Sequence, residues 1–182
     1  MNIVLIGYRG SGKTVVAELV AKRLRMQCIA TDARIVERAG MPIPEIVEKH
    51  GWPTFRDLES EQAREVAGLD NVVIDTGGGI VERPENVEPL RANGIVIWLK
   101  ASVDTIVSRI QGGTERPSLT GGKSFTEEVA EVLERRIPKY RSAAQYEVDT
   151  DQLTPEQVAD RVIEISMAET PSHAVSEHGY QK

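Results

Sequence analysis

Residues 7–14 read G-Y-R-G-S-G-K-T, which matches the G-x-x-x-x-G-K-[ST] pattern of a phosphate-binding loop. Glycines at this spacing let backbone N–H groups approach phosphate oxygens without a Cβ in the way. In such loops the lysine, here Lys13, reaches the β- and γ-phosphates, and the hydroxyl of Thr14 is a ligand for Mg²⁺. The nucleotide-binding residues that the motif predicts are Gly10, Ser11, Gly12, Lys13 and Thr14.

The segments on either side of this loop fit the same prediction. The apolar run 2–6 before it indicates a buried strand, and residues 14–25 after it have helical periodicity. The N-terminus of a helix adds partial positive charge toward bound phosphates. The context therefore favours a nucleotide site over a chance glycine turn.

The rest of the chain alternates apolar runs with helical stretches. The other predicted strands are 27–30, 72–75, 95–99 and 146–148. The other predicted helices are 32–39, 43–67 with a break near Gly51 and Pro53, 84–92, 102–111, 125–141 and 155–167. This alternation predicts an α/β fold of three layers (α/β/α), in which helices cover both faces of a parallel sheet. Ligands of such sheets bind at the carboxyl ends of the strands.

Length and composition restrict the other possibilities. The 182 residues predict one domain over 1–167, and the net charge of −6 argues against general affinity for nucleic acid. The single Cys28 excludes an internal disulfide and fits a reducing compartment. No apolar stretch approaches the ~20 residues of a membrane span. We therefore expect a cytoplasmic protein that acts without nucleic acid or membrane.

Two segments lack apolar periodicity. Residues 112–124 are rich in glycine at both ends and contain Arg116, so we expect them to form a lid. An arginine in a lid could neutralise charge on a phosphoryl group during its transfer. Residues 168–182 are polar and are expected to form a disordered tail.

Asp32 is the first candidate on the acceptor side, because it lies just after the predicted strand 27–30. At that position a carboxylate could accept a proton from a hydroxyl near the γ-phosphate. It could equally cap the next helix, since Thr31 and Asp32 both suit an N-cap position. Position alone does not decide between these two interpretations.

Arg56, Glu59 and Gly77–Gly79 offer a site for a small anion. Arg56 and Glu59 lie three residues apart on a predicted helix, so they share a face and can pair. A guanidinium held in this way is a good clamp for a second carboxylate, although the pair could also be an ordinary surface ion pair. Three glycines in a row cost conformational entropy and indicate close approach of a ligand to the backbone, or an unusual turn.

Other arginines extend the cationic set. Arg109 could lie flat on an adenine base, or be an exposed helical charge. Arg135 and Arg136 lie near the end of the helix 125–141, where one of them could face solvent or favour the helix C-terminus. A phosphate cradle, a candidate base and several arginines together predict phosphoryl transfer from ATP to a hydroxyl on a small molecule with a carboxylate.

With these residues identified, the chain resembles the shikimate kinases over about residues 2–165. The matching segments, in order, are Gly7–Thr14, Thr31-Asp32, Gly51–Glu59 with Phe55-Arg56, Gly77–Gly79, Arg116-Pro117 and Arg136-x-Pro138-x-Tyr140. The resemblance implies a nucleoside-monophosphate-kinase-like fold of the P-loop NTPases, with five parallel strands in the order 2-3-1-4-5. It implies transfer of the γ-phosphoryl group of ATP, with Mg²⁺, to the 3-hydroxyl of shikimate, a step toward chorismate and the aromatic amino acids. We expect a monomer whose partner is this small molecule.

The resemblance also implies a role for each candidate. Asp32 would hold the shikimate hydroxyls and act as the base, Lys13 and Arg116 would stabilise the transferring phosphoryl group, and Glu59 would orient Arg56. The carboxylate of shikimate would bind to Arg56, Arg136 and the Gly79 amide. The implied substrate-binding residues are Asp32, Arg56, Gly77, Gly78, Gly79 and Arg136, and the implied adenine-site residues are Arg109 and Pro155.

One departure from the family concerns Mg²⁺. The family usually has Asp-Thr-Asp after its second strand, whereas this chain has Ala30-Thr31-Asp32. The missing carboxylate normally helps to hold Mg²⁺ through its water shell. Thr14 and the ATP phosphates remain, and Mg²⁺ commonly keeps several waters. We therefore predict weaker Mg²⁺ binding, and a lower Mg²⁺ requirement when Ala30 is changed to Asp.

Two alternatives stay open on the sequence. Another small-molecule kinase of the same fold, such as a gluconate or nucleoside-monophosphate kinase, would share the loop and the lid but would not explain Phe55-Arg56 together with Gly77–Gly79. A kinase-like domain that binds its ligand without turnover would fit Ala30, although the presence of Lys13 and Asp32 argues against it.

Overall fold

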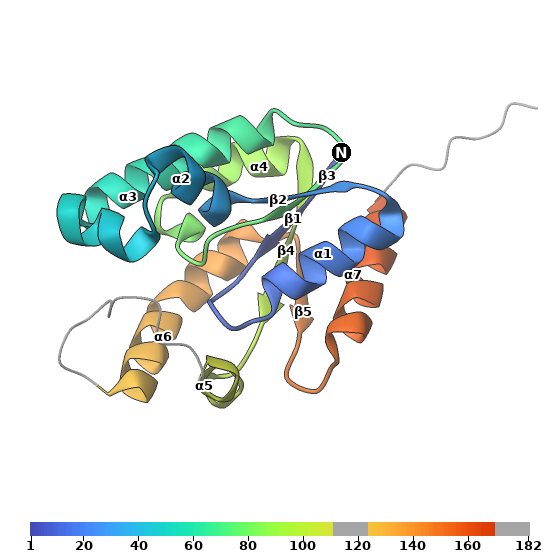
Figure 1. Ribbon diagram of the computed structural model, residues 1–182. Helices are drawn as coiled ribbons and strands as arrows, with labels where there is room; N and C mark the ends of the chain where they lie inside the picture. The colour runs from blue at the N-terminus through green and yellow to red at the C-terminus, as the bar shows by residue number, and fades with distance from the viewer. Residues whose placement is uncertain (111–123, 170–182) are drawn as a thin grey trace, which may run out of the picture.

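A parallel sheet forms the centre of the protein, for which a computed structural model describes residues 1–110 and 124–169. Within these residues the sheet has five strands in the order β2-β3-β1-β4-β5, and every neighbouring pair is parallel (Figure 1). The strands are β1 (Asn2–Ile6), β2 (Gln27–Ala30), β3 (Val72–Asp75), β4 (Gly94–Lys100) and β5 (Tyr146–Asp149). The predicted strands are confirmed to within one residue at each end, and the predicted strand order is confirmed.

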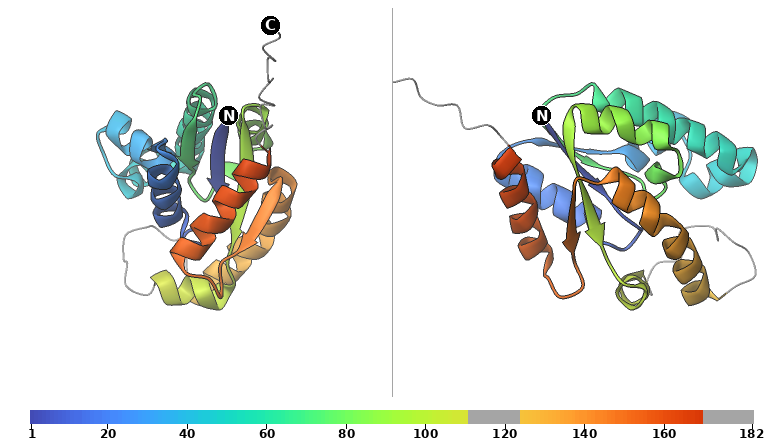
Figure 2. Two further views of the ribbon diagram at one scale, coloured as in Figure 1. Left: turned by 90° about the vertical axis from the view of Figure 1, so that its right-hand side faces the viewer. Right: turned by 180° about the vertical axis from the view of Figure 1, so that it is seen from behind.

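Helices cover both faces of this sheet, as predicted. They are α1 (Lys13–Leu24), α2 (Thr31–Ala39), α3 (Ile43–Ala67), α4 (Val87–Ala92), α5 (Val103–Ile110), α6 (Phe125–Ala143) and α7 (Pro155–Glu169). Helices α1 and α7 pack on one face, and α3, α4 and α6 pack on the other (Figures 1 and 2). Among the residues that the structure describes, no helix is both long and apolar enough to cross a membrane.

Three helix boundaries differ from the prediction by two residues or more; one of them is the end of α6, which continues two residues beyond 141, to Ala143. The segment 84–92 is not one helix, because Pro84–Asn86 form a short 3-10 turn before α4 begins. Pro89 lacks the N–H that a helix starting at 84 would need, whereas in the first turn of α4 that N–H is not required. Near the C-terminus of the chain, α7 continues to Glu169, two residues beyond the predicted end at 167. The Glu169 carboxylate accepts a hydrogen bond from the Tyr146 hydroxyl. The first two residues of the predicted disordered tail are therefore helical.

The predicted break in α3 is confirmed at Gly51. This residue has φ 81° and ψ 163°, a conformation that side chains other than hydrogen rarely allow. The predicted lid lies outside the described residues except for Ser124, which caps α6, and so does the tail from residue 170.

Alternate residues of the central strands supply two hydrophobic clusters, because successive side chains of a strand point to opposite faces. Val4 and Ile6 belong to the cluster under α3, α4 and α6, while Ile3 and Leu5 belong to the cluster under α1 and α7. A third, smaller cluster, called here the α2–α3 cluster, lies apart from the sheet. Its buried members are Ile35, Ile43, Ile46 and Phe55.

Candidate active site

The phosphate-binding loop joins β1 to α1, as the motif predicts. Gly12 precedes α1 with φ 92°, which places a residue without a side chain at the turn into the helix. Lys13 folds back over the loop, and its Nζ donates hydrogen bonds to the backbone oxygens of Gly7 (2.8 Å) and Tyr8 (3.0 Å). The ammonium group is thus held at the loop by neutral carbonyl groups.

A cavity of about 560 Å³ lies over this loop and the start of α1. Its walls include Gly10, Gly12, Lys13 and Thr14, four of the five predicted nucleotide-binding residues. The fifth, Ser11, is buried beneath the loop, and its backbone N–H donates to the Tyr8 oxygen (3.1 Å). The loop residues that face the cavity are therefore those expected to bind phosphates.

Asp32 is the second residue of α2 and lies where β2 ends. The residue that precedes the helix is Ala30, and no side chain caps it, so the interpretation of Asp32 as a helix cap is wrong. The Thr31 hydroxyl instead accepts a hydrogen bond from the Gly77 N–H (3.0 Å). A Cβ on Gly77 would collide with Asp32 Oδ1, so the carboxylate lies directly against bare backbone. The closeness of the Asp32 carboxylate explains why residue 77 is a glycine.

Arg56 lies on α3 and is held from several sides. It pairs with Glu59, and its Cζ lies 5.2 Å from the ring centre of Trp52. Only 15% of the Arg56 side chain and 2% of the Glu59 side chain are exposed, so the interpretation as a surface ion pair is wrong. A Cβ on Gly79 would lie 2.5 Å from Arg56 Cζ and 2.6 Å from Nη2. The guanidinium therefore occupies the space that a side chain at residue 79 would need.

Burial raises the pKa of Glu59, while the positive charge of Arg56 acts in the opposite direction. A buried carboxylate beside a buried guanidinium is stable only as a pair, since either group alone would be a buried charge. The buried pairing with Glu59 therefore restricts the direction of the Arg56 side chain.

Arg136, on α6, is 4% exposed and contacts Gly78 within the segment Gly77–Gly79, called here the glycine turn. Its Nη1 donates to the Gly78 oxygen (3.3 Å), and the Tyr140 hydroxyl donates to that oxygen as well (2.6 Å). Its Nε donates to Glu82 Oε1 (2.6 Å). Two hydrogen bonds, one from Nε and one from Nη1, thus fix the orientation of the guanidinium.

Glu82, just after the glycine turn, accepts hydrogen bonds from three positively charged side chains. Besides Arg136, it accepts hydrogen bonds from Lys139 Nζ (2.5 Å) and Arg135 Nη2 (3.1 Å). Burial alone would raise the pKa of Glu82, but the hydrogen bonds from Lys139 and Arg136 outweigh it and lower the pKa from 4.5 to about 2. Glu82 is therefore ionised at neutral pH and orients Arg136.

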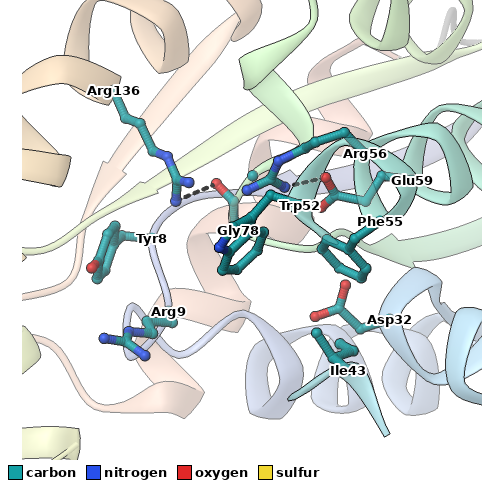
Figure 3. A pocket seen from close by; sticks show the side chains of 11 residues that line it. Tyr8, Arg9, Asp32, Ile43, Trp52, Phe55, Arg56, Glu59, Gly78 and Arg136 are labelled. Carbon is teal, nitrogen blue, oxygen red and sulfur yellow. Dashed lines mark hydrogen bonds and ion pairs between the residues drawn. The ribbon is translucent and has the colours of Figure 1, made fainter. Parts of the chain in front are cut away.

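Arg56 and Arg136 line a small cavity of about 40 Å³ together with Gly79 (Figure 3). Figure 3 shows the two guanidinium groups approaching Gly78 from α3 and from α6. This cavity, called here the arginine pocket, shares Asp32 and Gly78 with the larger cavity over the phosphate loop. An anion in the arginine pocket would therefore lie next to both Asp32 and the phosphates.

Two further predicted site residues that the structure describes, Arg109 and Pro155, do not line the arginine pocket. Arg109 bonds to the phosphate loop and to the end of β5, through the Gly10 oxygen (3.2 Å) and the Thr150 oxygen (3.0 Å). Pro155 is the first residue of α7 and borders neither of the two cavities. Arg116 lies outside the described residues.

A model of the family named shikimate kinase matches residues 9–166 of the chain. The chain belongs to the shikimate kinase family. A shikimate kinase of Caldicellulosiruptor bescii is 41% identical over 167 residues, which cover 92% of this chain and 96% of that protein. A shikimate kinase 2 of an Enterobacter species is 45% identical over 164 residues, covering 88% of this chain and 92% of that protein.

Solved structures of the shikimate kinase family agree with this fold. The shikimate kinase from Acinetobacter baumannii in complex with shikimate has a TM-score of 0.88 at 30% identity, covering 93% of this chain and 94% of that one. A gluconokinase from Sinorhizobium meliloti has a TM-score of 0.56 at 17% identity, covering 93% of this chain and 97% of that one. The gluconokinase likeness shows a shared fold alone.

The sequence-based prediction missed three residues of this shikimate kinase site. Asp75, the last residue of β3, accepts a hydrogen bond from the Thr14 hydroxyl (2.7 Å). Arg9 borders both cavities, and Glu82 holds Arg136. The available signal for Asp75 was a carboxylate at the end of a buried strand, while Arg9 and Glu82 only became recognisable once the fold brought them to the site.

Proposed function

We propose residue roles for the phosphorylation of shikimate at its 3-hydroxyl by ATP, the activity that family membership assigns to this chain. The observation that supports these roles best is the junction of the two cavities at Asp32. Shikimate has a carboxylate, which suits the arginine pocket, and hydroxyls, which would then lie toward Asp32 and the phosphate loop. The junction of the two cavities thus supports an acceptor site directly beside the donor site.

The carboxylate of shikimate binds to Arg56, Arg136 and the backbone N–H of Gly79. Both guanidinium groups are buried and held by carboxylates, so little side-chain freedom remains to be lost on binding. Charge-assisted hydrogen bonds of this kind are about twice as strong as neutral ones. The arginine pocket therefore supplies both affinity for the acceptor and its orientation.

Asp32 accepts the proton of the 3-hydroxyl as the oxygen attacks the γ-phosphorus of ATP. A new O–P bond forms to the acceptor, the bond between the γ-phosphorus and the β–γ bridging oxygen breaks, and ADP leaves. Lys13 moves from its carbonyl partners to the phosphates, where it stabilises the charge that develops during transfer. Arg116 does the same from the lid, and lid closure excludes water.

Mg²⁺ fits the oxygen groups at the start of α1. The Thr14 hydroxyl and the Asp75 carboxylate are ligands of the type that Mg²⁺ prefers. In the part of the chain that the structure describes, no cluster of three or more acidic, histidine or cysteine side chains could hold a metal by itself. Thr14 would hold Mg²⁺ together with phosphates and waters, and the bound ion would neutralise charge on the β- and γ-phosphates.

The remaining roles concern the nucleotide and the whole protein. Arg109 and Pro155 bind the adenine, with Arg109 already anchored between the loop and β5. All groups of the proposed site come from one chain, so a monomer suffices. The acidic composition and the single Cys28 fit a cytoplasmic protein that binds no nucleic acid.

The direct test measures ADP release from ATP and Mg²⁺ with and without shikimate, and identifies the product by mass spectrometry. We expect release that depends on shikimate and a product heavier by one phosphoryl group. Gluconate and nucleoside monophosphates serve as control acceptors and should give no stimulation. Shikimate binding by calorimetry without any ADP release would instead identify a binding domain without turnover.

A further inference from the structure

Ala30 stands where the resemblance to shikimate kinases led us to expect a carboxylate, yet the next strand supplies one at the same level. In the sheet, Ala30 of β2 is the register partner of Asp75 of β3. Paired residues of neighbouring parallel strands point to the same face and lie about 5 Å apart. A carboxylate at residue 75 therefore enters the region that a carboxylate at residue 30 would enter.

The cavity over the phosphate loop confirms that both positions face one space. Its walls include Ala30 and Asp75 as well as Lys13 and Thr14. The side chain at residue 30 ends at its Cβ, whereas the Asp75 side chain extends to the start of α1. The negative charge next to Thr14 thus comes from β3.

The hydrogen bond between Thr14 and Asp75 also sets the direction of the hydroxyl. Thr14 Oγ1 donates its single proton to Asp75 Oδ2 at 2.7 Å. A hydroxyl that donates its proton to a carboxylate keeps its lone pairs for another partner, and a charged acceptor strengthens that bond. The Thr14 oxygen is therefore oriented as a ligand for a cation. Its hydrogen bond to the Asp75 carboxylate also increases the electron density that the oxygen offers to a metal ion.

Resting on the proposed Mg²⁺-dependent function, we propose that Asp75 takes over the magnesium-supporting role of the carboxylate absent at residue 30. It does so by orienting the Thr14 hydroxyl and by placing negative charge beside the metal and its waters. Asp75 is a positioning residue, because it acts through Thr14 and through water. In this chain the carboxylate is on β3, at Asp75, and not on β2, at residue 30, but it faces the same part of the site.

The presence of Asp75 reverses the expected effect of Ala30→Asp on the Mg²⁺ requirement. If Ala30 simply weakened Mg²⁺ binding, Ala30→Asp would lower the Mg²⁺ requirement. With Asp75 already present, the new carboxylate would stand beside a like charge, and like charges at this separation repel. We therefore expect Ala30→Asp alone to give no gain.

The test measures the coupling between metal and nucleotide in the full chain, without shikimate. Calorimetry gives the Kd of a non-hydrolysable ATP analogue in EDTA and at saturating Mn²⁺, and the ratio of these two values is the coupling. The variants are Asp75→Asn, Asp75→Ala and Ala30→Asp/Asp75→Ala. Glu18→Gln is the matched control, since it removes an exposed carboxylate one helical turn after Thr14.

We expect Asp75→Asn to reduce this coupling ratio by about 10- to 100-fold, the usual effect of losing a group that supports a metal ligand. Its Kd in EDTA should stay the same or become tighter, because a negative charge near the phosphates is removed. Ala30→Asp/Asp75→Ala should regain most of the ratio lost in Asp75→Ala, and Glu18→Gln should keep the wild-type ratio.

A ratio in Asp75→Asn within twofold of wild type would overturn the proposal, provided that circular dichroism shows a folded protein. So would a double variant whose ratio is no larger than that of Asp75→Ala. Because shikimate is absent, failure of the chain to phosphorylate shikimate in the ADP-release assay would refute the proposed function alone. The electron paramagnetic resonance spectrum of bound Mn²⁺ gives a second readout that is independent of turnover.

Discussion

Replacement of Gly79 by Ala tests the arginine pocket without substituting either arginine. Gly79 has φ −93° and ψ 3°, which alanine adopts without strain, so the backbone should not change. The added Cβ would lie 2.5 Å from Arg56 Cζ and 2.6 Å from Nη2, whereas ordinary contacts begin near 3.4 Å. The guanidinium must therefore retreat by about 1 Å or more, which is enough to break a hydrogen bond.

The magnitude follows from the bonds that Arg56 loses. A hydrogen bond to a charged group contributes about 1.5–3 kcal/mol, and every 1.4 kcal/mol is a factor of ten. We expect Gly79→Ala to raise the KM for shikimate about 10- to 100-fold in a steady-state assay, with the KM for ATP unchanged. Gly68→Ala is the control, since its added Cβ would make only an ordinary contact of 3.5 Å.

The effect must disappear when Arg56 is absent. Arg56→Ala alone should raise the KM for shikimate, and Gly79→Ala should add nothing in that background, because both changes remove the same contact. Equal effects of Gly79→Ala with and without Arg56, or an unchanged KM for shikimate in a folded Gly79→Ala protein, would refute this account of the glycine turn.

Further predictions concern the base and the carboxylate behind Arg136. Asp32→Asn should lower kcat with the melting temperature retained; an unaltered kcat would remove Asp32 from the role of base. Glu82→Gln should raise the KM for shikimate about fivefold, equivalent to about 1 kcal/mol, and leave the KM for ATP unchanged, which a purely structural role would not do. The lowered pKa of Glu82 also predicts a pH effect: its ionised form stabilises the fold above the ordinary value of 4.5, and this contribution is lost as the pH falls toward 2. Denaturant titrations should therefore show a larger loss of unfolding free energy in wild type than in Glu82→Gln between about pH 5 and about pH 3, and equal losses would contradict the pairing.

Local patterns in the sequence were enough to predict the strands, the phosphate loop and the Arg56–Glu59 pair. Each of these depends on residues close in the chain, such as an apolar run or a spacing of three on a helix. The contact between Thr14 and Asp75 joins residues 61 apart, and it depends on the register of β3 beside β1. The hydrophobic pattern of a sequence does not predict the register between two strands. From the sequence, Asp75 could therefore be identified only as the last residue of a strand.

The contact between Arg136 and Glu82 was hidden for the same reason. The two residues are 54 apart and meet because α6 packs against the turn that follows β3. Arg109 likewise reaches Thr150 across 41 residues. In each case the residue type indicated a charged group that would form a hydrogen bond or an ion pair. The partner became known only from the way the helices and strands pack together.

The α2–α3 cluster gives part of the acceptor site a hydrophobic support that differs from the support of the phosphate loop. Asp32 and Arg56 lie on the helices that enclose this cluster, while the phosphate loop is supported by the sheet and its two larger clusters. Regions with their own small core open and close at a lower free energy than the whole fold. Changes inside the α2–α3 cluster can therefore shift Asp32 and Arg56 while Lys13 and Thr14, which rest on the sheet, keep their places, so the acceptor side of the site can change independently of the donor side.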